Sequence, residues 1–120
     1  MKLLKRLYEI HSPSRNENRI RTFIKQHVSK NTPDAVIEQD AIGNLYITRG
    51  DAENYPCIVA HLDQVQKIHS RDFRAIETRE IIFGYSPSKR QWEGLGADDK
   101  NGIWIALQCL ARYDVIKIAF

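Results

Sequence analysis

Two short segments contain the side chains that are the strongest candidates for metal binding or catalysis. The first is His61-Leu62-Asp63, which directly follows the apolar run at residues 57–60. Histidine is the most common metal ligand in proteins, and the second nitrogen of a ligating ring usually donates to a carboxylate or a carbonyl. Asp63 is close enough in sequence to be that partner of His61. A chain with four histidines and fifteen carboxylates also produces such a triplet by chance, and a surface pair is then the alternative.

The second segment, GLGADDKNG at residues 94–102, is more specific. Its adjacent carboxylates Asp98 and Asp99 stand between a glycine-containing turn and an apolar, helix-forming pattern. Capping explains one aspartate at a helix N-terminus, because its carboxylate accepts hydrogen bonds from free backbone N–H groups. Capping explains the adjacent pair less well. Two hard anionic oxygens at a loop-to-helix junction are also what a ligand bridging two divalent cations requires.

Together these segments resemble the dinuclear zinc peptidase family that includes the aminoacylase/carboxypeptidase and peptidase T-like enzymes. That family has H-x-D-x-V after a buried strand and G-x-G-A-D-D/M-K-x-G before a helix, which match residues 61–65 and 94–102. Residues 13–17 are similar to its P-S-x-x-E segment, and residues 40–46 to its D-x-x-G-N-L segment. The four matches follow the family's order over nearly the whole chain. Residues 1–120 are therefore identified as the N-terminal part of one such catalytic domain, without a lid domain.

The resemblance implies a role for each residue that matches the family's motifs. His61 would ligate one zinc ion, Asp98 would bridge two, and Asp63 would take part in catalysis by orienting the His61 ring. In family structures the peptide bond after the bridging aspartate is usually cis, which here is the bond from Asp98 to Asp99. The residues with a structural role at the site would be Gly96, Asp99 and Lys100.

The resemblance also implies a complete site larger than the one these residues supply. The family's general base is the first glutamate of a Glu-Glu pair after the strand that follows the helix, and three further side chains complete its ligand sets. The sequence reaches Phe120 with that strand still running. One histidine and one bridging aspartate cannot satisfy two zinc ions. We expect two zinc ions, with cobalt or manganese as alternatives, in a full-length enzyme, and partial occupancy or none in this chain, which would be inactive alone.

For a complete enzyme, the resemblance implies metal-dependent hydrolysis of a peptide or N-acyl amide bond, as in aminopeptidases and di- or tripeptidases. The expected partners are small peptide substrates and further copies of the chain, because an incomplete domain leaves apolar faces that a homo-oligomer would cover. Two alternatives stay open. One is a non-catalytic truncated homologue that acts as a binding or interaction module. The other is a mononuclear metal hydrolase with ligands from a partner chain.

Hydrophobic periodicity indicates the helices and strands that carry these residues. Helical spacing predicts helices at residues 2–10 and 100–112. A further helix is predicted between them, with Ile20, Phe23, Ile24 and Val28 on one stripe and its end before Asn31. Ser14 and Glu17 predict a capping box before the second helix. The wholly apolar run at residues 57–60 predicts a strand covered on both faces. Further strand patterns lie at residues 35–40, 45–48 and 115–120, with a hairpin over 73–83 and a turn-rich loop over 84–90.

These elements belong to the α/β class. With the resemblance they predict the N-terminal portion of an α/β/α zinc-peptidase catalytic domain. Its sheet would be mixed, with two N-terminal helices and a helix after the Asp-Asp motif. Parallel strands would place His61 and Asp98 at their carboxyl ends, where open α/β sheets bind ligands.

Composition narrows the remaining possibilities. No apolar run approaches the roughly 20 residues of a membrane helix, and early charges interrupt any signal-peptide core, so we expect a cytoplasmic protein with no membrane partner. Cys57 and Cys109 form no C-x-x-C pair and are interpreted as buried apolar residues. Residues 1–30 carry eight basic and two acidic side chains, which we interpret as solvated helix faces rather than a nucleic-acid surface. The other histidines, to which we assign surface roles, are His11, His27 and His69.

Overall fold

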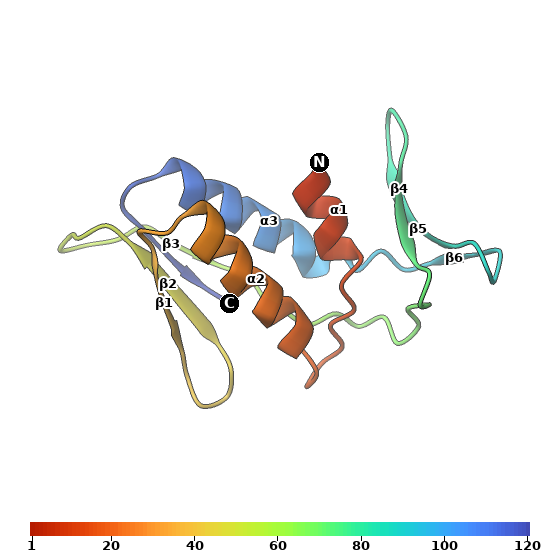
Figure 1. Ribbon diagram of the computed structural model, residues 1–120, viewed down its shortest axis with the longest axis horizontal. Coiled ribbons are helices and arrows are strands. Elements are labelled where there is room, and N and C mark those ends of the chain that lie inside the picture. The colour runs from red at the N-terminus through yellow and green to blue at the C-terminus, as the bar shows by residue number, and fades with distance from the viewer.

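The computed structural model describes residues 1–120 as three helices and seven strands (Figure 1). The helices are α1 (Lys2–Tyr8), α2 (Asn18–Asn31) and α3 (Ala97–Arg112). The strands are β1 (Val36–Gln39), β2 (Leu45–Arg49), β3 (Cys57–Val59), β4 (Arg74–Glu77), β5 (Ile82–Ser86), β6 (Gln91–Glu93) and β7 (Ile116–Ala119). The α/β class, the two N-terminal helices and the helix around the Asp-Asp motif are all confirmed.

The main sheet is mixed, as predicted, and has the strand order β1-β2-β7-β3. Strands β1, β2 and β7 pair antiparallel, whereas β3 runs parallel to β7. The register aligns Ile47 and Ile58 on either side of Ile118, so the three side chains lie in one row across the sheet. The last strand of the chain is therefore an interior strand, and β3, which leads into His61, is at the edge.

The core lies between the three helices and one face of this sheet. Along β2 and β7 the buried side chains alternate with exposed ones, because successive residues of a strand point to opposite faces. Leu45 and Ile47 on β2 are fully buried, while Tyr46 between them is 42% exposed. Buried residues of α1, α2 and α3 complete the same cluster. None of the helices combines the length and the apolar character needed to cross a membrane.

A second sheet, β4-β5-β6, is entirely antiparallel and lies at the opposite end of the molecule from the β1–β2 hairpin (Figure 1). It is anchored to the body by a small cluster in which Leu4 and Tyr8 of α1 pack with Phe73 and Ala75. The predicted hairpin over residues 73–83 is confirmed. The loop predicted at residues 84–90 is wrong in part, because β5 continues to Ser86 and pairs with β6, a strand that is too short to show a pattern.

The prediction that residues 57–60 are covered on both faces is wrong. Val59 is 73% exposed, and Cys57, interpreted as buried, is exposed as well. The physical reason is that the helices cover only one face of the sheet, so every second side chain of β3 points away from them. Cys109 on α3 is partly buried and packs against the main core.

The predicted capping box is also wrong. Helix α2 begins at Asn18, and the side chain of its N-cap residue, Glu17, makes no capping hydrogen bond. The Glu17 carboxylate instead accepts from the backbone N–H of Arg15 at 2.6 Å. The Ser14 hydroxyl donates to Asp63, which lies 49 residues further along the chain. The two residues that looked like a local cap therefore have other partners, one of which belongs to the candidate site.

Candidate active site

His61 and Asp98 are in contact although their residue numbers differ by 37. His61 follows the edge strand β3 and Asp98 lies in the first turn of α3. The ring nitrogen Nε2 of His61 is 2.9 Å from Oδ1 of Asp98. The His61 side chain is 52% exposed and that of Asp98 95% exposed, so the pair is open to solvent. The fold thus brings together the two candidate segments of the sequence, residues 61–63 and 94–102.

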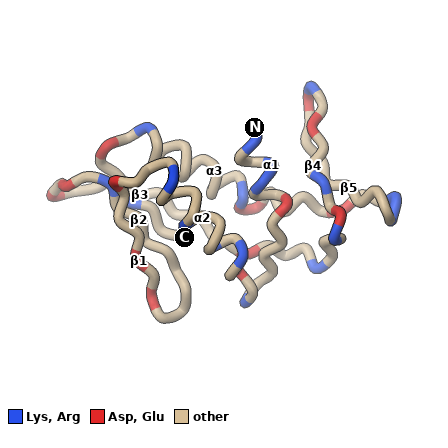
Figure 2. Tube along the Cα trace, viewed as in Figure 1, with Lys and Arg blue, Asp and Glu red and all other residues tan.

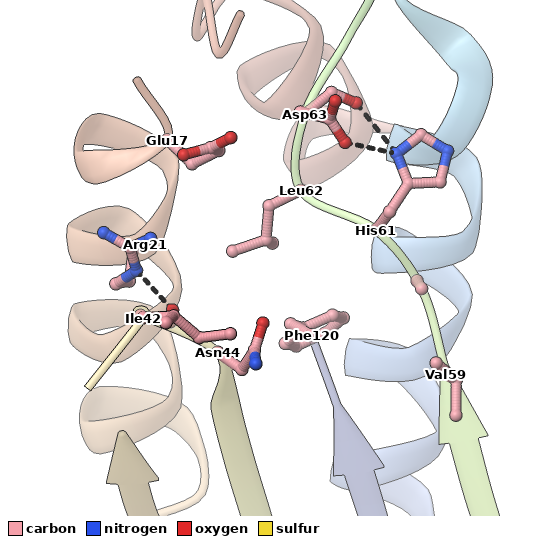
Figure 3. A pocket seen from close by; sticks show the side chains of 11 residues that line it. Glu17, Arg21, Ile42, Asn44, Val59, His61, Leu62, Asp63 and Phe120 are labelled. Atoms are coloured by element: carbon pink, nitrogen blue, oxygen red, sulfur yellow. Dashed lines mark hydrogen bonds and ion pairs between the residues drawn. The ribbon is translucent and has the colours of Figure 1, made fainter. Parts of the chain in front are cut away.

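Asp63 lies on the other side of the His61 ring (Figure 3). Nδ1 of His61 is 2.9 Å from the backbone oxygen of Asp63 and 3.1 Å from its carboxylate Oδ1. The other carboxylate oxygen, Oδ2, accepts a hydrogen bond from the Ser14 hydroxyl. Ser14, in the loop after α1, therefore orients the carboxylate of Asp63, which in turn orients the imidazole ring of His61. Sequence reasoning did not find this role of Ser14, because it assigned the hydroxyl to a helix cap.

The electrostatics of this group follow from these contacts. Partial desolvation on its own lowers the pKa of His61, but hydrogen bonds to Asp98 and Asp63 and the charges of both carboxylates outweigh it and raise the pKa. The hydrogen bond from Ser14, assisted by the charge of His61, lowers the pKa of Asp63. The carboxylates of Asp63 and Asp98, on either side of the His61 ring, therefore stabilise a positive charge at this position. In this structure that charge is the proton of the imidazolium ring.

The two adjacent aspartates have different partners. Asp98 and Asp99 have non-helical backbone angles, and the peptide bond between them is cis. Asp99 turns inward, and its Oδ1 accepts from the backbone N–H of Gly102 at 3.1 Å, which is a helix-capping hydrogen bond. A side chain at Gly102 would collide with that carboxylate, since an added Cβ would lie 2.4 Å from Oδ1. Capping thus accounts for Asp99, and it leaves Asp98 free to face His61.

Lys100 ties the start of α3 to the loop that carries His61. Its side chain is 1% exposed, and Nζ donates to the backbone oxygen of Ile10 and to Oε1 of Gln64. No carboxylate pairs with this ammonium group, and burial lowers its pKa to about 8. Lys100 therefore fixes, from one buried point, the relative positions of the α1–α2 loop, the residues after β3 and the first turn of α3.

Gln64 is the second residue that sequence reasoning missed. It is 2% exposed, its backbone N–H donates to the Ser12 oxygen at 2.8 Å, and its Oε1 accepts from the Ser12 N–H at 3.2 Å. The Ser12 hydroxyl also donates to the backbone oxygen of Leu62 at 2.8 Å. A glutamine three residues beyond the candidate ligand His61 gives no hint of this burial. Gly96 fits closely beside it, because its φ is +69° and an added Cβ would lie 3.0 Å from Nε2 of Gln64.

A pocket of about 340 Å³ opens beside His61 and Asp63 (Figure 3). Its walls come from the first turns of α2, from the β1–β2 turn and from the ends of β3 and β7. Arg21 on α2 donates from Nε to the backbone oxygen of Gly43 at 2.6 Å and thereby fixes the β1–β2 turn against the helix. The carboxyl ends of the two parallel strands β3 and β7 thus border both the pocket and the His61 group.

The donors present suit zinc in type but not in number. Imidazole nitrogen and carboxylate oxygen are common zinc ligands, and two ligands of a tetrahedral zinc lie roughly 3.3 Å apart when their bonds are about 2.0–2.1 Å long. The separation of 2.9 Å between Nε2 of His61 and Oδ1 of Asp98 is close to that value. The chain places no group of three or more histidine, cysteine or acidic side chains together around a single position.

Two of the remaining histidines do not have the simple surface roles we assigned to them. The rings of His11 and His69 stack with centroids 4.8 Å apart, and His69 stacks in turn on Phe73 at 4.3 Å. Both histidines are half-buried, and neither contacts His61. They hold the segment after the candidate site against the end of α1, which is a packing role.

Scans against known protein families and against curated proteins find no match. Solved structures do match. A tripeptidase from Staphylococcus aureus superposes with a TM-score of 0.71 at 22% identity, over 99% of this chain and 34% of its own. An aminoacylhistidine dipeptidase from Vibrio alginolyticus has a TM-score of 0.69 at 18% identity, over 98% of this chain and 26% of its own.

The Pyrococcus horikoshii TET1 peptidase, which can assemble into a tetrahedron or a large octahedral shell, has a TM-score of 0.64 at 17% identity. The match covers 99% of this chain and 59% of that peptidase. The chain thus spans between about a quarter and three fifths of the length of these structures. Residues 1–120 have the fold of a portion of peptidase catalytic domains.

Proposed function

We propose that residues 1–120 are the N-terminal part of the catalytic domain of a metal-dependent peptidase. The complete enzyme would hydrolyse a peptide or N-acyl amide bond in a short substrate, as an aminopeptidase or a di- or tripeptidase does. The observation that carries this proposal is the distance of 2.9 Å between His61 Nε2 and Asp98 Oδ1, with Asp63 behind the ring. The similarity of fold to a tripeptidase and a dipeptidase supports short peptides as the substrate class.

Each residue then has a definite task. His61 would bind one zinc ion through Nε2, and Asp98 would bridge two. Zinc, or cobalt or manganese in its place, polarises a scissile carbonyl and lowers the pKa of a bound water. Asp63 accepts from Nδ1–H of His61, which leaves the Nε2 lone pair directed at the metal. Ser14 keeps Asp63 in that orientation through its hydrogen bond to Oδ2.

The site proposed here needs further residues. His61 and Asp98 supply two donors, whereas each zinc ion takes four or more. We propose that the other ligands and the general base lie outside residues 1–120, in the same polypeptide or in a partner chain, and that residues 1–120 alone are inactive. We also propose a homo-oligomer, because the uncovered face of the main sheet exposes apolar side chains such as Val36 and Val59.

The DNA downstream of the Phe120 codon provides the first test. We expect an in-frame Glu-Glu pair within a few codons of Phe120, at the end of the strand that the structure shows as β7. A stop codon directly after Phe120 would contradict a complete peptidase in one chain and would favour a non-catalytic interaction module.

Cobalt binding provides the second test. Titration of the chain with Co²⁺, followed by visible absorption, should give a weak signal that His61→Ala and Asp98→Asn each abolish. His27→Ala is the matched control, because it removes a histidine that lies on α2, outside the candidate site. If the control loses the signal and the two site variants keep it, the proposed ligands are wrong.

A further inference from the structure

A second cavity lies between α1 and α2, away from the candidate active site. Its volume is about 490 Å³, within the range of small-molecule sites. Three basic side chains border it, Lys2 and Arg6 from α1 and Lys30 from α2. No acidic residue lines it. We call this cavity the α1–α2 groove.

The basic side chains of the α1–α2 groove have no partners within the chain. Lys2, Arg6 and Lys30 form no ion pair, although Lys5 on the same helix as Arg6 pairs with Glu77 at 3.8 Å. Figure 2 shows Lys and Arg positions along α1. Glu9 and Glu77 lie with Lys2 and Arg6 around an adjoining cavity, but neither lines the α1–α2 groove. Three cations from two helices that form no ion pair produce a positive local potential in the groove, which favours an anionic ligand.

The floor of the α1–α2 groove is apolar and aromatic. Leu3 and Phe23 line the groove and are partly buried against the main core. The ring of Phe23 stacks on that of His27, with centroids 6.1 Å apart and planes inclined by 25°. An apolar portion of a ligand would therefore meet the stacked aromatic rings, while its charged portion meets the basic side chains at the rim.

His27 adds a polar group that points to the same kind of ligand. Burial lowers the pKa of its ring, so the ring is neutral at neutral pH. Its Nδ1 lies 3.3 Å from Nδ2 of Asn31, which can donate to it, and its Nε2 has no hydrogen-bond partner in the chain. Nε2–H is then a free donor for an anionic oxygen.

We propose that the α1–α2 groove binds a small organic phosphate. The phosphate would lie among Lys2, Arg6 and Lys30, where a guanidinium group can donate two parallel hydrogen bonds to it. The apolar portion of the ligand would pack on Phe23. A small molecule fits better than a nucleic-acid strand, because the basic side chains converge on one cavity rather than follow a line across the surface. This site is independent of the proposed peptidase activity.

Phenyl phosphate is the probe, since it combines one phosphate with one aromatic ring. Its binding is followed by NMR through the ring protons of His27, with inorganic phosphate and a single-stranded oligonucleotide titrated in parallel. We expect saturable shifts with phenyl phosphate, weaker binding of inorganic phosphate, and a higher pKa of His27 in the phenyl phosphate complex. The double variant Arg6→Gln/Lys30→Gln should bind about tenfold more weakly or worse.

Lys67→Gln/Lys89→Gln is the matched control, because it removes two exposed basic side chains outside the groove and should bind as the wild type does. Equal affinity for inorganic and phenyl phosphate would overturn the assignment of an organic ligand. An oligonucleotide that binds more tightly than phenyl phosphate, or equal weakening in the control, would overturn the site itself.

Discussion

The buried ammonium group of Lys100 donates a hydrogen bond to the side-chain oxygen of Gln64, 36 residues earlier in the chain. The same Nζ atom also donates to the backbone oxygen of Ile10. The segments that carry His61 and Asp98 are therefore joined by a contact beneath them, and their relative position does not depend on the exposed pair alone.

The replacement Lys100→Met tests this contact. It preserves most of the volume but leaves the oxygens of Gln64 and Ile10 buried without a donor, so we expect the free energy of unfolding to fall by about 1–3 kcal/mol. Urea denaturation followed by circular dichroism measures it. Lys67→Met, at an exposed position, is the control. A loss no larger than that of Lys67→Met would show that the buried contact does not stabilise the fold.

Separate replacements of Asp98 and Asp99 should affect different properties, because one residue is proposed to bind metal and the other caps α3. Asp99→Ala removes the hydrogen bond that caps α3 at Gly102, and we expect it to lower the free energy of unfolding by about 1 kcal/mol. Asp98→Ala removes an exposed carboxylate, and the change should stay within about 0.5 kcal/mol. Cobalt binding should show the reverse order, with the larger loss in Asp98→Ala. If Asp98→Ala is the less stable of the two variants, this division of roles is wrong.

Gly96 should not tolerate a side chain. Its φ of +69° is strained for other residues, and an added Cβ would press on the buried amide of Gln64. We expect Gly96→Ala to lower the free energy of unfolding by about 1–2 kcal/mol. Gly94→Ala provides the comparison, because its φ is not positive and the atoms nearest to an added Cβ belong to the flexible side chain of Gln66. Thermal denaturation of both variants should rank Gly96→Ala as the less stable.

His69 should make stability depend on pH. Burial, together with the charges of His11 and Lys100, lowers its pKa in the folded chain, against the smaller opposite effects of its contact with Tyr8 and the charge of Glu93. As the pH falls through about 6.5, the unfolded chain therefore takes up a proton before the folded chain does, and the free energy of unfolding decreases.

The variant His69→Phe keeps an aromatic ring between His11 and Phe73 but cannot titrate. Its free energy of unfolding should decrease less than that of the wild type between about pH 7.5 and about pH 5.5. Urea denaturation at these two values measures the difference. An equal decrease in both proteins would mean that His69 contributes nothing to the pH dependence.

The local elements and the candidate site residues can be predicted from the amino-acid sequence. Apolar spacing placed the third helix at residues 100–112, and the regular part of α3 begins after Asp99, as that spacing requires. Residue patterns likewise predict strands where the structure has β1, β2 and β7. These features depend on residues that are close in sequence, so the hydrophobic periodicity is enough to predict them. The same holds for the two motifs around His61 and Asp98, which were recognised by residue type and order.

The partner of each polar group depends instead on how distant segments of the chain pack together. Ser14 fits a helix cap by spacing, yet its hydroxyl donates to Asp63 because the α1–α2 loop packs against the segment after β3. The motif around Lys100 predicts a structural role at the site, but its burial and its hydrogen bond to Gln64 follow only from the fold. The exposure of Cys57 depends on which face of the sheet the helices cover. A hydrogen bond or a covered face is a property of two distant segments, and a pattern within either segment does not contain it.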